Sequence, residues 1–192
     1  MVLIDEDPGR TELRWVIRHD YRTAMERLLE HLKERGLTSV ALISGAEENA
    51  WNVHTREAYS SWCRMHGLCP CIEVVDENLA ADDVVKLGRS LLTGQGRPDS
   101  LIVGPSDYAS IIASVAGTMG LTIPGDLMLA SLIDTEHSRT STPPLTALDL
   151  RQEELAAHAV ELVFRLFAGE DPPSRPIVLH PQLQLRGSTR RR

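Results

Sequence analysis

The chain has 192 residues, of which 42% are hydrophobic and 24% are charged, and its formal net charge is −7. This composition is ordinary for a globular protein with a sizeable core, and the acidic balance disfavours an electrostatic grip on nucleic-acid phosphates. No apolar run approaches the ~20 residues that a membrane helix needs, and residues 1–4 are followed by acids, unlike a secretory signal. We therefore expect a cytoplasmic protein without a membrane partner, whose three cysteines are reduced thiols.

The first forty residues predict two short strands and a helix. Residues 2–5 form an apolar run that begins abruptly, which suggests that an upstream portion is absent, and residues 15–17 form a second run. Asp20 stands where a helix cap belongs, although the same carboxylate can also serve a ligand, and Gly36 marks the helix end. The helix itself is indicated by apolar residues at helical spacing, namely Met25, Leu28, Leu29 and Leu32.

From residue 39 onward, strands and helices alternate. We predict strands at residues 39–44, 72–75, 100–104, 127–133 and 177–185, and helices after the polar loop 45–52 and at residues 80–92, 107–119 and 151–167. The intervals suit crossovers between parallel strands. The predicted fold class is therefore α/β, with a parallel sheet and flanking helices.

The candidate binding residues follow the predicted strands. Ser106 comes after the strand 100–104, and Asp134 comes after the strand 127–133. In a parallel sheet, ligands meet the loops at the carboxyl ends of the strands, so we expect Ser106 and Asp134 on one rim, together with Asp20 and Trp51. Trp51 lies in the polar loop 45–52, where a flat ring can either stack on a sugar or base or pack into the core.

No enzyme motif is present. The sequence has no G-x-S-x-G, no phosphate-binding P-loop and no G-x-G-x-x-G. Ser44 and Gly45 lie between a strand and a helix, which suits an ordinary turn or an anion site, and a hydrolase using Ser44 or His19 is the remaining catalytic hypothesis. We expect a binding protein and not an enzyme, with no catalytic residues.

A short cysteine cluster raises the question of a metal. Cys63, His66, Cys69 and Cys71 form C-x2-H-x2-C-x-C, and thiolates with an imidazole are natural zinc ligands. The spacing matches no structural zinc pattern, and Cys63 lies on the apolar stripe of its helix, as small buried cysteines do. We expect neither a metal nor a cofactor.

Several segments together resemble one known family. The stretches are PDSLIVGPSDYAS, GLTIPGDLMLASLIDTEHS and PPLTALDL, supported by Asp20 with Glu30-His31-Leu32, by Ile43-Ser44-Gly45 and by LQLRGST at residues 183–189. Their order and spacing are similar to the effector-binding core of the lac repressor/galactose repressor family of transcription regulators. The resemblance spans nearly the whole chain.

The resemblance implies a fold and a division into lobes. The fold would be periplasmic-binding-protein-like (type I), with a truncated amino lobe and without the helix-turn-helix through which such proteins bind DNA. Residues 1–18 with 151–178 would be the remnant of the amino lobe, residues 19–150 with 179–187 the carboxyl lobe, and residues 188–192 a basic tail. A homodimer is also implied, and the helix 107–119 carries apolar residues suited to that contact.

The residues at the positions that contact the ligand in this family differ here from the family pattern. Thr55 stands where an arginine is usual, with Arg56 beside it. Ser106 replaces an asparagine, and Ile133 replaces the first of two acids, which leaves Asp134 as the second. We therefore expect a small polar effector, sugar- or nucleoside-like and with an apolar edge, bound between the lobes by Asp20, Trp51, Thr55, Arg56, Ser106 and Asp134.

Two hypotheses about function remain beside the hydrolase. The first is an effector sensor whose ligand favours one lobe orientation and thereby signals to a DNA-binding part. The second is a binding module with no DNA partner, such as a solute receptor, against which the absence of a secretory signal counts.

Overall fold

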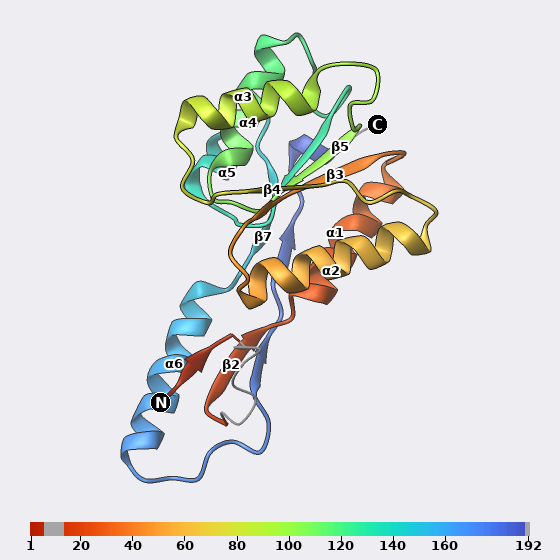
Figure 1. Ribbon diagram of the computed structural model, residues 1–192. Helices are drawn as coiled ribbons and strands as arrows, with labels where there is room; N and C mark the ends of the chain where they lie inside the picture. The colour runs from red at the N-terminus through yellow and green to blue at the C-terminus, as the bar shows by residue number, and fades with distance from the viewer. Residues whose placement is uncertain (6–13, 191–192) are drawn as a thin grey trace.

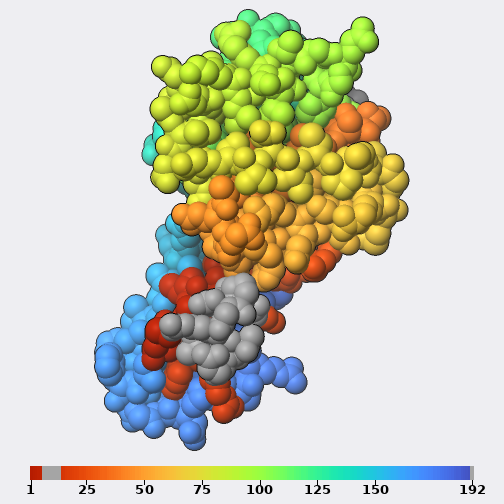
Figure 2. All heavy atoms as spheres, viewed as in Figure 1, coloured from red at the N-terminus to blue at the C-terminus, as the bar shows by residue number. Residues whose placement is uncertain are grey.

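The computed structural model describes residues 1–5 and 14–190, and these form two sheets joined at a narrow waist (Figures 1 and 2). The small sheet is parallel, with the order β1-β2-β8. One helix, α6, lies along it. These elements are β1 (Leu3–Ile4), β2 (Val16–His19), α6 (Gln152–Phe167) and β8 (Ile177–Leu179).

The large sheet has the order β4-β3-β5-β6-β7-β9. Its first five strands are parallel, and β9 runs antiparallel to β7 at one edge. The predicted α/β class with a parallel sheet is thus confirmed. The strands are β3 (Val40–Gly45), β4 (Ile72–Val75), β5 (Ser100–Val103), β6 (Met128–Ser131), β7 (Thr146–Asp149) and β9 (Gln182–Gln184).

Helices cover both faces of the large sheet, and each face has its own core. The helices α1 (Tyr21–Glu34) and α2 (Ala50–Met65) pack against one face, and α3 (Ala81–Leu92) and α4 (Tyr108–Thr118) pack against the other. A short helix, α5 (Glu136–Thr140), follows β6. Because both faces are covered, β3, β5 and β6 are buried along their whole length and are mostly apolar, as in other parallel sheets. None of the helices in the described ranges is long and apolar enough to cross a membrane.

The local signals in the sequence account for the start of the large region. The Asp20 carboxylate accepts a hydrogen bond from the Thr23 N–H at 3.1 Å, which confirms Asp20 as the cap of α1. Met25, Leu28 and the other apolar residues at that helical spacing are fully buried. Apolar periodicity and capping chemistry therefore placed this helix correctly.

The chain end differs from the prediction. Residues 177–185 form two strands in different sheets, because the chain crosses from β8 to β9 after Leu179. Ser188 and Thr189, expected in a basic tail, are buried. The Thr189 hydroxyl lies 2.9 Å from Nε2 of His31 and 2.6 Å from the Thr146 hydroxyl, so the end of the chain is tied to the large sheet. Residues 191 and 192 lie outside the described part, as do residues 6–13 of the expected amino lobe.

Along the described residues, the chain passes between the two sheets three times, after His19, after Asp149 and after Leu179. These crossings lie close together at the waist. The Asp20 N–H donates to the Leu179 carbonyl at 2.8 Å, which joins the first crossing to the third. The surfaces around the waist therefore bring together residues that are far apart in the sequence.

Candidate ligand-binding site

Two cavities open at the waist. The first, here called the rim cavity, has a volume of about 430 Å³ and is lined by Ile133, Asp134, Arg139, Asp149, Leu150 and residues 151–154. The second, the waist cavity, has a volume of about 350 Å³ and lies between the small sheet and the starts of α1 and α2. Both volumes fall in the range of small-molecule sites, roughly 300–1,000 Å³.

The rim cavity is built from the ends of neighbouring strands. Asp134 follows β6, and Asp149 ends β7, which pairs with β6 in parallel. Because parallel strands end at the same edge, the two acids lie on one rim, and the start of α6 supplies the other wall. Arg151 enters α6 in the left-handed conformation, at φ 57°, and its N–H donates to the Asp149 carboxylate at 2.8 Å. The large sheet and the helix of the small region therefore form this cavity together.

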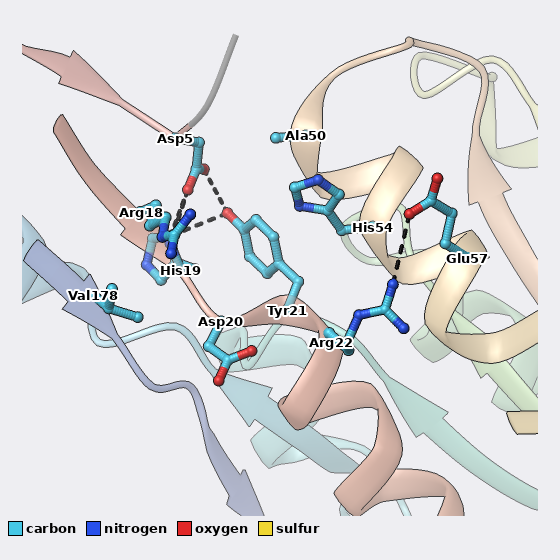
Figure 3. Close-up of a pocket in the computed structure, with 10 residues that line it drawn as sticks. All are labelled: Asp5, Arg18, His19, Asp20, Tyr21, Arg22, Ala50, His54, Glu57 and Val178. Carbon is cyan, nitrogen blue, oxygen red and sulfur yellow. Dashed lines mark hydrogen bonds and ion pairs between the residues drawn. The ribbon is translucent and has the colours of Figure 1, made fainter. Parts of the chain in front are cut away.

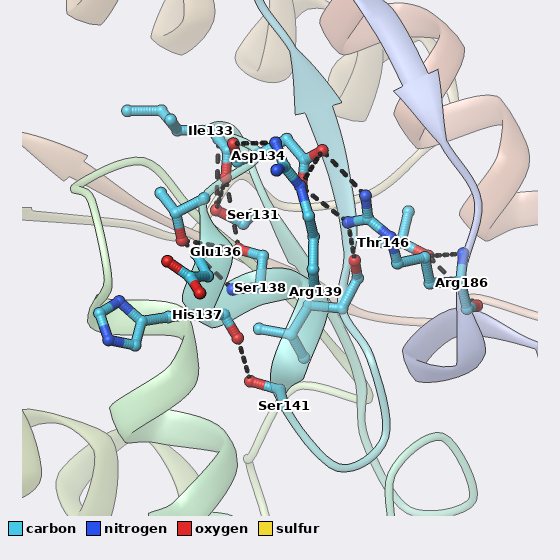
Figure 4. A network of polar contacts seen from close by, with 12 residues as sticks. Ser131, Ile133, Asp134, Glu136, His137, Ser138, Arg139, Ser141, Thr146 and Arg186 are labelled. Carbon is cyan, nitrogen blue, oxygen red and sulfur yellow. Dashed lines mark hydrogen bonds and ion pairs between the residues drawn. The ribbon is translucent and has the colours of Figure 1, made fainter.

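The Asp134 carboxylate is held by the protein itself. Arg186 donates from both guanidinium ends, with Nη1 to Oδ1 and Nη2 to Oδ2 both at 2.8 Å, and Arg139 Nε lies 3.2 Å from Oδ2 (Figure 4). Burial by itself raises the pKa of Asp134, but hydrogen bonds from Arg186 and then Arg139 outweigh it and lower the pKa. Asp134 is therefore an ionised, fixed anion in the wall of the cavity.

Arg139 is the more adaptable cation at this rim. Its side chain is largely exposed, whereas that of Asp134 is buried, and its contacts are to the carboxylate and, at 3.4 Å, the carbonyl of Asp134. Arg151 pairs with Glu154 at 2.6 Å on the opposite wall. Together with Asp149, these groups offer both donors and acceptors to a ligand, and Ile133 adds an apolar edge.

A polar network forms the base of the waist cavity (Figure 3). Asp5, His19 and Tyr21 point toward one another, and the hydroxyl of Tyr21 lies 2.5 Å from Oδ2 of Asp5. Burial by itself raises the pKa of Asp5, but hydrogen bonds from His19 and Tyr21 outweigh it and lower the pKa. Burial and the nearby Asp5 carboxylate raise the pKa of the Tyr21 phenol well above its usual range. The carboxylate is thus ionised, and the phenol keeps its proton.

The expected site residues are divided between different places. Asp20 lines the waist cavity, where it also lies 3.4 Å from His180, whereas Asp134 lines the rim cavity. Ser106 is exposed in the turn after β5 and lines neither cavity. Asp20 and Asp134 thus line different cavities, because Asp20 follows β2 of the small sheet. Binding of one ligand by Asp20, Trp51, Ser106 and Asp134 stays a prediction.

Trp51 lies in a helix and not in a loop. Asn49 accepts from the Asn52 N–H at 2.9 Å and caps α2, so the helix begins at Ala50, earlier than predicted. The Trp51 ring meets the Tyr21 ring edge to face, with centroids 4.8 Å apart. Of the two alternatives for Trp51, the structure supports packing, since the ring is half-buried at the contact between α1 and α2.

Thr55 and Arg56 are also turned away from both cavities. Thr55 is buried, and its hydroxyl donates to the Trp51 carbonyl at 2.7 Å within the helix. The guanidinium of Arg56 donates to the Gly45 carbonyl at 3.1 Å and to the Glu48 carboxylate at 2.5 Å. The polar groups of both residues are thus hydrogen-bonded within residues 45–56, and contact of these two residues with a ligand stays a prediction.

Sequence reasoning missed the residues that complete the rim cavity. Arg139 and Arg151 belong to no motif in the sequence, and they reach the rim only because α5 and the start of α6 lie there. Arg186 did carry a signal, since it lies in the stretch LQLRGST at residues 183–189. Pairing Arg186 with Asp134, 52 residues away, required the tertiary structure.

The described part of the chain contains neither a catalytic arrangement of Ser44 with His19 nor a group of side chains that could hold a metal. The Ser44 hydroxyl is buried and contacts the Gly45 carbonyl at 3.4 Å, while His19 is bonded to Asp5 and Leu150. A serine nucleophile beside a histidine base is thus not formed by these two residues. Cys63 is buried on α2, and within residues 1–5 and 14–190 no three His, Cys, Asp or Glu side chains are grouped to hold a metal.

Comparison with known proteins decides the family. Residues 29–189 match the model of the periplasmic binding protein-like domain. The chain belongs to this family. This periplasmic binding protein-like domain is 29% identical over 182 residues to a probable opine utilization operon repressor from Rhizobium rhizogenes, covering 88% of this chain and 89% of that protein. It is 23% identical over 181 residues to the HTH-type transcriptional regulator GalR from Streptococcus thermophilus, covering 89% of this chain and 54% of that regulator.

Solved structures show the same fold. A LacI family transcriptional regulator from Bifidobacterium animalis superposes with a TM-score of 0.88 at 24% identity, over 96% of this chain and 67% of that one. A CelR–cellobiose complex gives a TM-score of 0.83 at 20% identity, over 97% of this chain and 58% of that one. The domain is thus the core of the lac repressor/galactose repressor type, and its relatives are transcription regulators and not enzymes. It spans about half the length of regulators such as GalR.

Proposed function

We propose that this domain senses a small polar effector for a transcription regulator, with the ligand bound in the rim cavity. The observation that carries the proposal is that both regions of the molecule line this cavity: Asp134 and Asp149 come from the large sheet, and Arg151 comes from the start of α6. A ligand that contacts both walls has a different affinity for each relative orientation of the two sheets. Such a difference is the thermodynamic requirement for transmitting a signal.

The chemistry of the rim cavity suggests the class of ligand. The acids and arginines of this cavity suit hydroxyl groups together with a charged group, and Ile133 suits an apolar edge. The relatives include a probable repressor of opine utilization and a regulator bound to cellobiose. We therefore favour a polyhydroxyl or nucleoside-like ligand, with conjugates of a sugar and an amino acid as the first to test.

The remaining parts of the proposal follow from the family. The two sheets would act as two lobes, divided near residues 18, 150 and 178, and the effector would favour one arrangement of them. DNA would be contacted through a helix-turn-helix outside these 192 residues, in the cytoplasm, and the domain would act as a homodimer. These are the features that a sensor of this type needs in order to change operator binding.

The test is titration calorimetry across sugars, nucleosides and sugar–amino acid conjugates, with variants of the rim cavity. Arg139→Ala and Asp149→Asn each remove one candidate contact, and a hydrogen bond to a charged group is worth roughly 1.5–3 kcal/mol, so each weakens binding about ten- to a hundredfold. The matched control is Arg56→Ala, which removes an arginine that faces away from the cavity. Tight binding that neither rim variant disturbs would place the site elsewhere.

A further inference from the structure

The network at the base of the waist cavity joins two of the chain crossings. Asp5 follows β1, His19 ends β2, and Tyr21 begins α1. The His19 ring is buried, with Nδ1 3.2 Å from Oδ1 of Asp5 and 3.0 Å from the Tyr21 hydroxyl. On its other side, Nε2 lies 2.9 Å from the backbone carbonyl of Leu150, in the segment that leads from β7 to α6.

Counting donors and acceptors assigns the protons in this network. The Leu150 carbonyl only accepts, so Nε2 of His19 donates to it. The Tyr21 hydroxyl has one proton, and its 2.5 Å contact with Asp5 indicates that it donates to that carboxylate. Nδ1 of His19 contacts both the Tyr21 oxygen and Oδ1 of Asp5. The His19 ring therefore bridges the Asp5 carboxylate and the Leu150 carbonyl.

Leu150 connects this network to the rim cavity. Leu150 lines the rim cavity beside Asp149, and its backbone carbonyl accepts a hydrogen bond from His19 on the side of the waist cavity. A ligand that shifts residues 149–151 therefore has to move the carbonyl to which His19 is bonded. The waist cavity, whose other charged lining groups are Arg18, Asp20, Arg22, His54 and Glu57, gives the network an open side toward which it can rearrange.

We propose that Asp5, His19 and Tyr21 form a lock that couples the rim cavity to the relative orientation of the two sheets. In the closed state, the bond from His19 to the Leu150 carbonyl holds the β2–α1 crossing against the β7–α6 crossing. Breaking that bond frees the small sheet and α6 to turn relative to the large sheet. The coupling to a ligand rests on the proposed function, whereas the lock itself does not.

The lock is tested by measuring a distance between the two regions with spin labels. Cys69 is an exposed natural attachment point on the large region, and Ala168→Cys adds one at the exposed end of α6. Cys71→Ser leaves these two as the accessible thiols, since Cys63 is buried. Pulsed electron resonance then gives the distribution of distances. In the closed state we expect one dominant distance.

His19→Val removes the ring that bridges Asp5 and Leu150. We expect the population with altered distance to rise about tenfold to a hundredfold, because the bridge includes a hydrogen bond to the charged Asp5 carboxylate. The matched control is His158→Val on α6, which removes a partly exposed histidine next to Glu154 and Glu161 and leaves the distribution unchanged. An unchanged distribution for folded His19→Val overturns the lock.

Tyr21→Phe is the milder second variant, for use if His19→Val does not fold. It keeps the ring that packs against His19 and Trp51 and removes only the hydroxyl that donates to Asp5. We expect a smaller shift in the same direction, and no shift in either variant refutes the proposal. Because these measurements are made without ligand, their outcome is independent of whether calorimetry finds an effector in the rim cavity.

Discussion

The two sheets differ in how completely they are built. The large sheet has six strands and a separate apolar core on each face. Within the described residues, the small sheet has three short strands, and its core contains four buried residues, Trp15, Ile17, Leu162 and Leu179. Since burial of apolar area supplies most folding free energy, we expect the large region to be the more stable of the two and the small region to depend more on its polar contacts at the waist.

The contrast extends to the surfaces. Residues 107–119 were expected to offer apolar surface to a second copy, but Ile112 and Val115 are buried and Ile111 and Met119 are partly buried against α3 and the sheet. The apolar surface that this helix offers to a second copy is therefore limited to its partly buried residues, and the contact stays a prediction. On the small region, an apolar stripe on α6 is instead exposed, and it consists of Val160, Val163, Phe164 and Phe167.

The largest expected effect comes from the buried ion pair of the large region. Asp134→Ala leaves the guanidinium of Arg186 without its bidentate partner, and breaking a buried pair in this way costs about 3–5 kcal/mol of unfolding free energy. The measurement is urea denaturation followed by circular dichroism. Adding Arg186→Met should restore much of the loss, since it removes the uncompensated charge. A double variant no more stable than Asp134→Ala would contradict this account.

A pair of core substitutions tests whether the two regions unfold separately. Ile102→Ala creates a cavity in the large core and should destabilise it by about 2–5 kcal/mol, whereas Leu162→Ala should act mainly on the small region. Trp62 reports the large core by fluorescence and Trp15 the small one, so single-tryptophan variants separate the transitions. If both substitutions shift the unfolding transitions reported by Trp62 and Trp15 equally, the molecule unfolds as one cooperative unit, and the two regions do not differ in stability.

The α6 stripe predicts weak self-association through the small region. Phe164 is 70% exposed and Phe167 is 83% exposed, and each fully buried Phe contributes about 1.5–3 kcal/mol. Phe164→Ser with Phe167→Ser should therefore raise the dimer dissociation constant at least tenfold in sedimentation equilibrium. Met65→Ser on α2, at 71% exposure, is the control and should have no effect. A dimer unaffected by the α6 variant would assign the interface to another surface.

The smallest effect concerns acid stability. The folded-state pKa of Asp134 lies below its ordinary value of 3.8, so its ion pairs stabilise the fold above that value and the contribution is lost as pH falls through the folded pKa. Asp134→Asn should therefore show a shallower loss of stability than the parent protein when denaturant unfolding is compared between pH 5 and pH 3. Parallel curves of unfolding free energy against pH for the two proteins would show that Asp134 does not cause the loss of stability in acid.

Much of the large region could be predicted from the sequence because its signals are local. Apolar spacing located α1, the apolar runs located β3, β5 and β6, and their alternation implied the parallel sheet. Asp20 was also recognised as a cap, since capping involves a partner only three residues away. The family resemblance followed from the same strands and turns, and the match over residues 29–189 confirmed it.

The binding surface could not be predicted in the same way, because it depends on which distant residues meet. The polar groups of Thr55 and Arg56 donate hydrogen bonds to backbone carbonyls of their own segment, and the sequence pattern did not reveal these acceptors. Asp134 was placed correctly at the end of β6, but its partner Arg186 reaches it only because β9 pairs with β7. The sequence by itself determined the class of fold and its order of elements through short-range periodicity. Only the tertiary structure decided how Arg139, Asp149 and Leu150 meet at the waist, because those contacts arise where the chain crosses between two sheets.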